Sequence, residues 1–351
     1  MTTNSPAVSI TGIGSVSPNG ALAGLIPPST VEPSAITAWT TAGLRRAFLV
    51  NPFRPASVVP GLKTRRLDRL SAWALVASSL AIQDAGIDLT QVDRSRVAVV
   101  FATTFGCVEL TESFYQSAVT HGWSGTDPAT FPETLANAPA SHVALFHNLR
   151  GPNITVGSRA FAGESALIQS ASLLRHGQAD VAVVVAGDTL TRAVYEWYET
   201  AGLLSPACYN AEPVPEAAGF IPSEGVAALV LEPEGRRETR SYAKLRSGRW
   251  AAGGHPVETV RQMLGGSVPT LTVCTTNGAP CATSSVAAVA REIAGDGGTI
   301  ISPQAAAAGL ADTGALLHLI LALSTHSESG QLLLLGTSGD NSFAAILLER
   351  P

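Results

Sequence analysis

The chain has 351 residues, of which 46% are apolar, 14% are charged and 6% are aromatic. So low a share of charged residues excludes a disordered chain. The formal net charge of −5 at pH 7 gives no electrostatic basis for binding a nucleic acid. The length suffices for one large domain or two fused halves.

The cysteine and histidine spacings predict neither a metal site nor a cofactor. Cys107, Cys208, Cys274 and Cys281 form no C-x-x-C pair and fit no zinc pattern, and the seven histidines form no H-x-x-H cluster. The N-terminus lacks the basic start of a signal peptide. The apolar run 313–326 spans 14 residues, whereas a membrane helix needs about 20. We therefore expect a soluble, cytoplasmic protein.

The first third of the chain alternates strand-like and helix-like segments. A β-branched run predicts a strand over 7–13 that ends in a turn at Gly14. Residues 15–62 are rich in Pro, Gly and Ser and predict loops. Apolar spacing predicts a helix over 66–85, a continuous apolar run predicts a buried strand over 97–103, and a further helix is expected over 109–119.

The central segment 151–174 has the pattern of a strand, a tight turn and a helix. An apolar strand, 154–156, leads through Gly157 and Ser158 into the small-residue passage 159–163, and a helix is expected to 176. Several enzyme folds present a nucleophile on such a turn, where the helix N-terminus supplies N–H groups for an oxyanion. Here Ala160 and Phe161 occupy the apex, and neither can attack a carbonyl.

A second pattern occurs twice along the chain. The pattern consists of a helix, Gly-Gln, an apolar strand and Gly-Asp. Its first copy ends at Asp188, and its second copy, which begins with the expected helix 313–326, ends at Asp340. Such a repeat predicts a duplicated architecture. We place the boundary near Gly235, which gives an N-terminal half, 1–235, and a shortened C-terminal half, 236–351.

These motifs resemble the β-ketoacyl synthases. Four segments are similar to that family's sequence: the ITGIG opening, the passages 66–106 and 130–148, and Gly151-Pro152 with Thr155-Val156 and Gly163. The resemblance implies a thiolase-like α/β fold, with duplicated βαβ-rich halves in an αβαβα layered sandwich. It places Ala160 where the family has its acyl-accepting cysteine.

The other catalytic positions are also altered. The resemblance places Asn277, or its neighbour Thr276, at the first family histidine, Ala308 at the second, and Pro303 at the lysine. The glycine-rich loop near the C-terminus reads Ser-Gly-Asp-Asn at 338–341. With these residues exchanged for inert groups, no proton transfer or acyl acceptance is expected there.

A ketosynthase framework without its catalytic residues resembles the chain length factors of type II polyketide synthases. These proteins pair with an active ketosynthase and shape the tunnel for the acyl chain delivered by an acyl carrier protein. Ala160 in place of the glutamine common in the aromatic class, together with the short length, favours the highly reducing, polyene-making relatives. The resemblance implies that the helix 109–119 lines the tunnel, with Thr111, Phe114, Tyr115 and Ala118 on one face, and Phe161 is a further candidate.

Other interpretations stay open at the level of sequence. The chain could be an acyltransferase or decarboxylase with non-standard residues, for which Ser158 and Glu164 beside the turn are candidates, or a homodimeric binding protein. Phe114 and Tyr115 could simply fill core, and Phe161 could fill the vacated pocket. Cys274, Cys281, His318 and His326 are interpreted as packing or capping residues. Arg65, Arg66 and Arg69 could meet an acidic carrier protein, although solvated charges at a helix start explain them as well.

Overall fold

The computed structural model describes residues 7–27, 31–36, 44–209, 219–237, 239–275, 280–295, 297–302, 314–338 and 340–351, with the backbone alone for 280–283. The strands of the first half are β1 (Val8–Ser17), β2 (Gly20–Ala23), β3 (Ser34–Ala35), β4 (Arg46–Ala47), β5 (Val97–Thr103), β6 (Asn153–Gly157), β7 (Val181–Asp188) and β8 (Gly225–Pro233). Its helices are α1 (Pro55–Val58), α2 (Arg69–Asp84), α3 (Val108–His121), α4 (Ala138–His147), α5 (Ala162–Arg175) and α6 (Arg192–Thr200).

The second half repeats this scheme with fewer helices in the described residues. Its strands are β9 (Ala243–Ala251), β10 (Leu271–Cys274), β11 (Thr299–Ile301), β12 (Gly330–Thr337) and β13 (Phe343–Arg350). Its helices are α7 (Pro256–Leu264), α8 (Pro280–Ala294) and α9 (Ala315–Thr325). Short 3-10 turns η1 to η4 lie at 94–96, 123–125, 131–134 and 206–208.

The two halves have the same sheet topology. The strand order is β11-β10-β12-β13-β9-β1-β8-β7-β5-β6, with β2 paired to β1. Numbered within each half, both sets of five strands run 3-2-4-5-1, with parallel pairs at β5–β6, β5–β7, β10–β11 and β10–β12 and antiparallel pairs elsewhere. The expected duplicated architecture is therefore present. Gly235 lies between β8 and β9, and the division at that residue remains our proposal.

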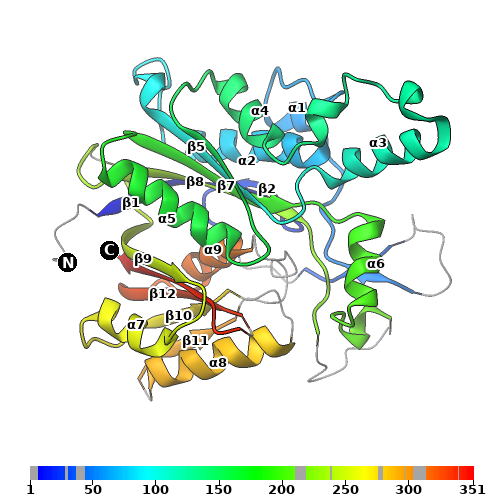
Figure 1. Ribbon diagram of the computed structural model, residues 1–351. Coiled ribbons are helices and arrows are strands. Elements are labelled where there is room, and N and C mark those ends of the chain that lie inside the picture. Colours follow the sequence, from blue (N-terminus) through cyan, green and yellow to red (C-terminus); the bar gives the residue numbers. More distant parts are fainter. Residues whose placement is uncertain are drawn as a thin grey trace.

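Five layers follow from this arrangement (Figure 1). The strands of both halves belong to one sheet, joined where β1 pairs with β9. Helices α2 and α4 cover the outer face of the first-half strands, α5 and α9 lie between the strands of the two halves, and α7 and α8 cover the outer face of the second-half strands. Each interface contains an apolar core, because central strands such as β5, β7 and β8 are buried and read as nearly continuous apolar runs. The thiolase-like αβαβα fold expected from the sequence is confirmed.

The first strand differs from the sequence prediction. β1 continues through Gly14 to Ser17 instead of turning there. A Cβ atom on Gly12 would lie 2.2 Å from the carbonyl oxygen of Ala81, and one on Gly14 would lie 2.1 Å from that of Ala77. These glycines therefore let α2 approach the strand closely, which is a packing role and not a turn role.

Candidate functional site

The turn at 159–163, which we call the elbow, joins β6 to α5 as the sequence predicts. Phe161 is the residue before the helix and has a left-handed backbone conformation, with φ of 57°. A bulky residue rarely adopts this conformation, and it costs about 1–3 kcal/mol unless the surroundings enforce it. The ring of Phe161 is buried, so packing holds it in place.

The hydroxyl of Ser158 closes the elbow on itself. It donates a hydrogen bond to the carbonyl oxygen of Ala160 at 2.7 Å and accepts one from the backbone N–H of Ala160 at 3.2 Å. A nucleophile elbow stabilises an oxyanion with backbone N–H groups aimed at the reacting atom. At Ala160 this N–H group is engaged by Ser158.

An open cavity of about 420 Å³ remains over Ala160. Ligand pockets in proteins fall within about 300–1,000 Å³, so the space is large enough for part of a substrate. Its wall combines apolar side chains with hydroxyl and amide groups from β6, the elbow, α5, the end of β9 and the β12–β13 turn. It is lined by Val156, Ser158, Ala160, Phe161, Ser165, Ile168, Gln169, Trp250, Ala251, Ala252 and Ser342.

Glu164, in the first turn of α5, is buried and 1% exposed. Its Oε1 atom is hydrogen-bonded to the hydroxyl of Thr275, just after β10, whereas Oε2 is buried and has no hydrogen-bond partner among the described residues. Burial raises the pKa of Glu164 to about 7, although the hydrogen bond from Thr275 lowers it. Sequence analysis, which named Glu164 only as a candidate beside the turn, missed this contact, because Thr275 lies 111 residues away.

Three elements converge on this carboxyl group because Gly336, near the end of β12, has no side chain. A Cβ atom there would lie 2.9 Å from Thr275 Oγ1, 3.0 Å from Glu164 Oε1 and 3.0 Å from Phe161 Cδ1. Such contacts are shorter than nearly all real Cβ contacts. Gly336 therefore leaves the space that the Phe161 ring and the Glu164 carboxyl group occupy.

The positions that the resemblance assigns to the family histidines, Asn277 and Ala308, lie outside the described residues, as do Thr276 and Pro303. The side chain of Cys281 is also outside them. Cys274 is buried, and burial raises the pKa of its thiol to about 11, so it is unreactive near neutral pH. The elbow side of the site lies within the described residues, and there Ala160 offers no nucleophile.

The candidate tunnel residues lie on α3, none of whose residues is fully buried. Thr111 donates its hydroxyl to the carbonyl oxygens of Cys107 and Thr134 at 2.8 and 3.1 Å, so it ties α3 to the following segment. Ala118 and Phe114 are half-buried. Tyr115 is 53% exposed, so it does not fill the core of this chain.

An aromatic surface extends from α3 onto the segment after it. Phe114 contacts Tyr115 and Phe131 with ring centroids 5.9 Å apart in both cases, and Tyr115 contacts Trp123 at 6.3 Å. Trp123 is 69% exposed and Phe131 is 50% exposed. Contiguous exposed aromatic side chains of this kind mark interaction surfaces. The sequence spacing found the α3 members of this surface but not Trp123 and Phe131.

β6 lies at one edge of the sheet. Within the described residues it pairs only with β5, in parallel register from Val99–Asn153 to Thr103–Gly157. An edge strand presents unpaired N–H and C=O groups that another chain can bind. The strand that enters the elbow is therefore available for pairing with a second subunit.

Four cations, which we call the basic patch, are sequence neighbours of residues that line a cavity of about 390 Å³ on the first half; the charged side chains in the lining itself are Asp68, Arg69 and Glu109. Arg54, Lys63, Arg65 and Arg66 are exposed, and in the described part of the chain none of them forms an ion pair. They alternate along the sequence with lining residues of the cavity such as Phe53, Pro55, Thr64 and Leu67.

Arg69 does not belong to this patch. It pairs with Glu109 at 2.9 Å and Glu224 at 3.1 Å, and its guanidinium lies 4.9 Å from the ring centroid of Trp73. The half-buried Arg69 therefore links α2, α3 and the segment before β8, and only Arg65 and Arg66 of the three expected arginines face solvent.

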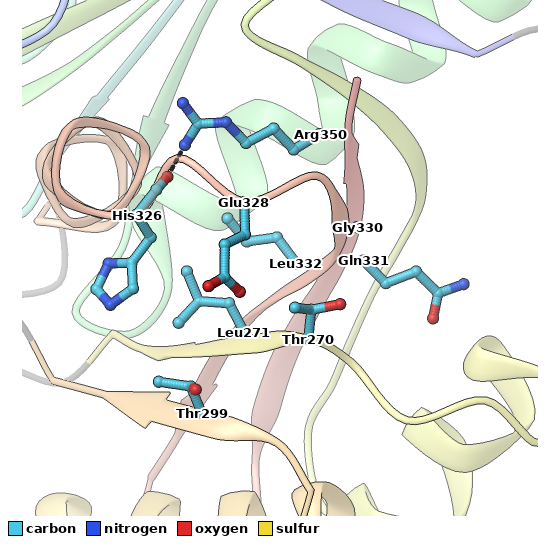
Figure 2. A pocket seen from close by; sticks show the side chains of 9 residues that line it. All are labelled: Thr270, Leu271, Thr299, His326, Glu328, Gly330, Gln331, Leu332 and Arg350. Atoms are coloured by element: carbon cyan, nitrogen blue, oxygen red, sulfur yellow. Dashed lines mark hydrogen bonds between the residues drawn. The ribbon is translucent and has the colours of Figure 1, made fainter.

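The far end of the second half contains a much smaller cavity (Figure 2). Its volume is about 30 Å³, enough for about one water molecule. The guanidinium of Arg350 donates to the backbone carbonyl of His326, as Figure 2 shows, and to that of Leu323 at 2.9 Å. Arg350 thus caps the C-terminal end of α9, and the cavity is a structural feature and not a substrate site.

The described residues contain neither a metal-ligand cluster nor a membrane-spanning helix. No three or more of their His, Cys, Asp and Glu side chains lie together as metal ligands would. No helix among them has the length and apolar character needed to cross a bilayer.

Comparison with known proteins assigns the family. The model of the β-ketoacyl synthase N-terminal domain matches residues 25–236, more than half of the chain. The chain therefore belongs to the β-ketoacyl synthase family, as its motifs and thiolase-like fold predict.

The relatives are distant. A 3-oxoacyl-[acyl-carrier-protein] synthase 2 from Vibrio cholerae serotype O1 is 25% identical over 242 residues, which are 64% of this chain and 57% of that protein. The chain thus spans less than two thirds of the length of this relative. The ishigamide ketosynthase/chain length factor is similar in structure, with a TM-score of 0.72, 21% identity and coverage of 98% and 99% of the two chains. A type II polyketide synthase acyl-carrier protein in complex with its ketosynthase, bound to the hexaketide, has a TM-score of 0.76, 17% identity and coverage of 99% of each chain.

Proposed function

We propose that this chain is a non-catalytic ketosynthase-like subunit, a chain length factor of a type II polyketide synthase. In this proposal it pairs with an active ketosynthase and shapes the tunnel that receives the growing acyl chain. The observation that carries the proposal is Ala160 at the apex of an otherwise intact elbow, because alanine cannot form the thioester. The engaged N–H group of Ala160 supports the same conclusion.

The uncovered surfaces support a role in pairing. β6 offers an unpaired strand edge beside the elbow, and the aromatic surface of Phe114, Tyr115, Trp123 and Phe131 is exposed on the same half. Buried strand edges and aromatic clusters are typical of stable subunit interfaces. We propose that the partner ketosynthase covers both, with Thr111, Phe114, Tyr115, Ala118 and Phe161 near the acyl chain.

The acyl carrier protein is the second proposed partner. The basic patch of Arg54, Lys63, Arg65 and Arg66 stands out on a chain of net charge −5, and its charges are not neutralised by ion pairs in the described residues. Such a patch attracts an acidic protein and increases the rate of its encounter. We place the complex in the cytoplasm and extend the proposal to the highly reducing, polyene-making class.

The test uses purified chain with and without its neighbouring ketosynthase. We expect the two chains to elute as a heterodimer after co-expression. Incubation with malonyl- or acyl-carrier protein followed by mass spectrometry should find the acyl group on the ketosynthase alone. The matched control replaces the reactive cysteine of the ketosynthase by alanine, which should abolish all acylation. A covalent acyl group on this chain, or elution as a stable homodimer that ignores the ketosynthase, would contradict the proposal.

A second candidate function has one specific observation in its favour. Glu164 lies beside the elbow with a pKa raised to about 7, and groups so perturbed are common at catalytic sites. A decarboxylase or acyltransferase on this fold could use it as a proton donor. The isolated chain would then release carbon dioxide from malonyl-carrier protein, and Glu164→Gln would abolish the release.

A further inference from the structure

The ring of Phe161 stands between the cavity over Ala160 and a buried carboxyl group. Phe161 lines that cavity, whereas its neighbours Glu164 and Gly336 do not. Both lie close to the ring, because a Cβ atom on Gly336 would be 3.0 Å from Phe161 Cδ1 and 3.0 Å from Glu164 Oε1. The ring is 8% exposed and Glu164 is 1% exposed. The ring is therefore a partition, with the cavity on one side and the carboxyl group on the other.

Holding the ring in this place is unfavourable in two ways. The backbone of Phe161 is left-handed, with φ of 57°, which bulky side chains rarely adopt. Glu164 Oε2 is buried and has no hydrogen-bond partner among the described residues, although water entering from the cavity could satisfy it. Such outliers persist only where the surrounding structure enforces them, and they cluster at active sites and ligand clamps. The position of the ring therefore points to a role beyond filling the core.

We propose that Phe161 is a plug that closes the inner end of the cavity over Ala160 and keeps an acyl chain out of the space in front of Glu164. The identity of the excluded ligand rests on the proposed function, whereas the plug itself follows from the packing. A chain length factor with this plug leaves the growing acyl chain to the tunnel that it shares with the ketosynthase. Phe161 is then a specificity-determining residue, because its size decides how deep a ligand can enter.

The wall of the cavity suits an uncharged ligand. None of the described residues that line it carries a charged side chain. Val156, Ile168 and Trp250 supply apolar surface, and Ser165 and Gln169 supply a hydroxyl and an amide group. This combination matches an acyl chain on an amide-containing arm such as pantetheine, since apolar walls with a few polar groups bind ligands of that kind.

Gly336 is the complement of the plug. The ring and a side chain at residue 336 would compete for the same space, because contacts of 2.9–3.0 Å surround the position of the missing Cβ atom. The backbone of Gly336 is not left-handed, so its conformation alone does not demand glycine. The pair therefore predicts a compensation: once the ring is removed, a side chain at residue 336 can refill the space.

The first experiment measures whether the ring shields the carboxyl side of the partition. Glu164→Cys puts a thiol behind the ring, and labelling of the full chain by iodoacetamide is followed by peptide mass spectrometry. Adding Phe161→Gly should increase the labelling rate at position 164 by about ten-fold or more, because exposure controls the reactivity of a cysteine. Glycine suits the left-handed backbone of residue 161, so this change adds no strain.

Cys208 is the control within the same protein. It is a buried thiol in the separate core that contains α6, and its labelling rate should stay the same in both variants. Phe161→Ala repeats the opening with a residue other than glycine and should give the same rise at position 164. An unchanged rate there, or a rise that Cys208 shares, would overturn the plug, because a shared rise means a general loosening of the fold.

The second experiment asks whether the ring limits the length of a bound acyl chain. S-decylpantetheine and S-ethylpantetheine are unreactive thioethers with a long and a short chain, and calorimetry measures their affinity for the full chain. Phe161→Gly should bind the decyl probe about ten-fold more tightly than the wild type, the gain from burying about two further methylene groups. The ethyl probe should bind both proteins equally. Adding Gly336→Val should refill the space and return the affinity for the decyl probe to that of the wild type.

Equal affinity of the wild type and Phe161→Gly for the decyl probe, or an equal gain for both probes, would refute the plug. Neither experiment contains the partner ketosynthase, so these outcomes leave the proposed subunit role untouched. Conversely, acylation of this chain by a carrier protein would contradict that role, while a shielded thiol at position 164 would still support the plug.

Discussion

The backbone N–H of Ala160 donates a hydrogen bond to Ser158 Oγ at 3.2 Å, in the place where a nucleophile elbow would aim that group at an oxyanion. The same hydroxyl holds the Ala160 carbonyl at 2.7 Å. The apex of the elbow therefore carries no nucleophile, and the N–H group of its apex residue is already engaged by the Ser158 hydroxyl.

Ala160→Cys should therefore not restore acyl transfer. The new thiol would face the open cavity and react with a small alkylating reagent, but the loss of one oxyanion donor alone costs about 100- to 1,000-fold in rate. We expect acylation by acyl-carrier protein to be at least 100-fold slower than for the partner ketosynthase, measured by intact-protein mass spectrometry. Rapid stoichiometric thioester formation on Ala160→Cys would contradict this expectation.

Shortening the aromatic surface should lengthen the product. Tyr115 is exposed and Phe114 is half-buried, so Tyr115→Ala should cost less than about 1 kcal/mol in the stability of the isolated chain. In the reconstituted synthase, we expect both Phe114→Ala and Tyr115→Ala to give longer polyketides, analysed by mass spectrometry of the released chains.

Thr120→Ala is the matched control for these variants. Thr120 lies on the same helix, is exposed, and bonds only to the Gln116 carbonyl of its own helix among the described residues, at 2.8 Å. It should leave the product length unchanged. If Phe114→Ala and Tyr115→Ala behave like this control, α3 does not line the tunnel.

Reversing charge in the basic patch should weaken carrier-protein binding. Arg65 and Arg66 are exposed, so Arg65→Glu with Arg66→Glu should reduce the association rate by about ten-fold at low salt, and less at high salt. Surface plasmon resonance at two ionic strengths measures both effects. Arg261→Glu with Arg291→Glu, which removes two exposed arginines from α7 and α8 of the second half and changes the net charge by the same amount, should bind as the wild type does. Equal loss in both variants would point to net charge instead of the patch.

His318→Leu should stabilise the protein and reduce its acid sensitivity. His318 is buried in α9, both ring nitrogens lack partners within the described residues, and burial lowers its pKa to about 4. The imidazole of the unfolded chain takes up a proton near pH 6.5. The stability that depends on a neutral His318 is therefore complete above that pH and is lost as the pH falls toward 4. Leucine removes this pH dependence. It also removes a buried polar group whose missing hydrogen bonds cost about 1–3 kcal/mol of stability. Urea unfolding at pH 5 and 7.5 measures both, and a less stable variant at pH 7.5 would show that the imidazole is needed.

Local pattern was sufficient to predict much of the fold. The apolar run 97–103 is β5 without a residue of difference, and the expected helix over 66–85 is α2. α2 begins at Arg69 because Asp68 caps it, accepting the N–H of Leu70 at 2.8 Å. The repeated helix–strand pattern correctly indicated a duplication, since each copy contributes a central helix and its following strand.

Contacts between distant residues could not be predicted in this way. Nothing near Glu164 in the sequence indicates that its partner is Thr275, and the close approach of Ala77 to Gly14 appears only when α2 lies on β1. The elbow itself was predictable because its strand, turn and helix are consecutive. Its chemical state was not, because the engaged N–H of Ala160 depends on how the Ser158 hydroxyl turns.

The open edge of β6 has a consequence for how a cell can make this protein. Unless another chain covers it, this edge has amide and carbonyl groups without strand partners among the described residues, on a half that also exposes aromatic rings, and such a combination favours aggregation and proteolysis. If the proposed partner ketosynthase covers the edge, synthesis of the two chains together would keep uncovered copies scarce. The soluble yield of this chain should accordingly depend more on co-expression with the proposed partner ketosynthase than on any residue within the elbow.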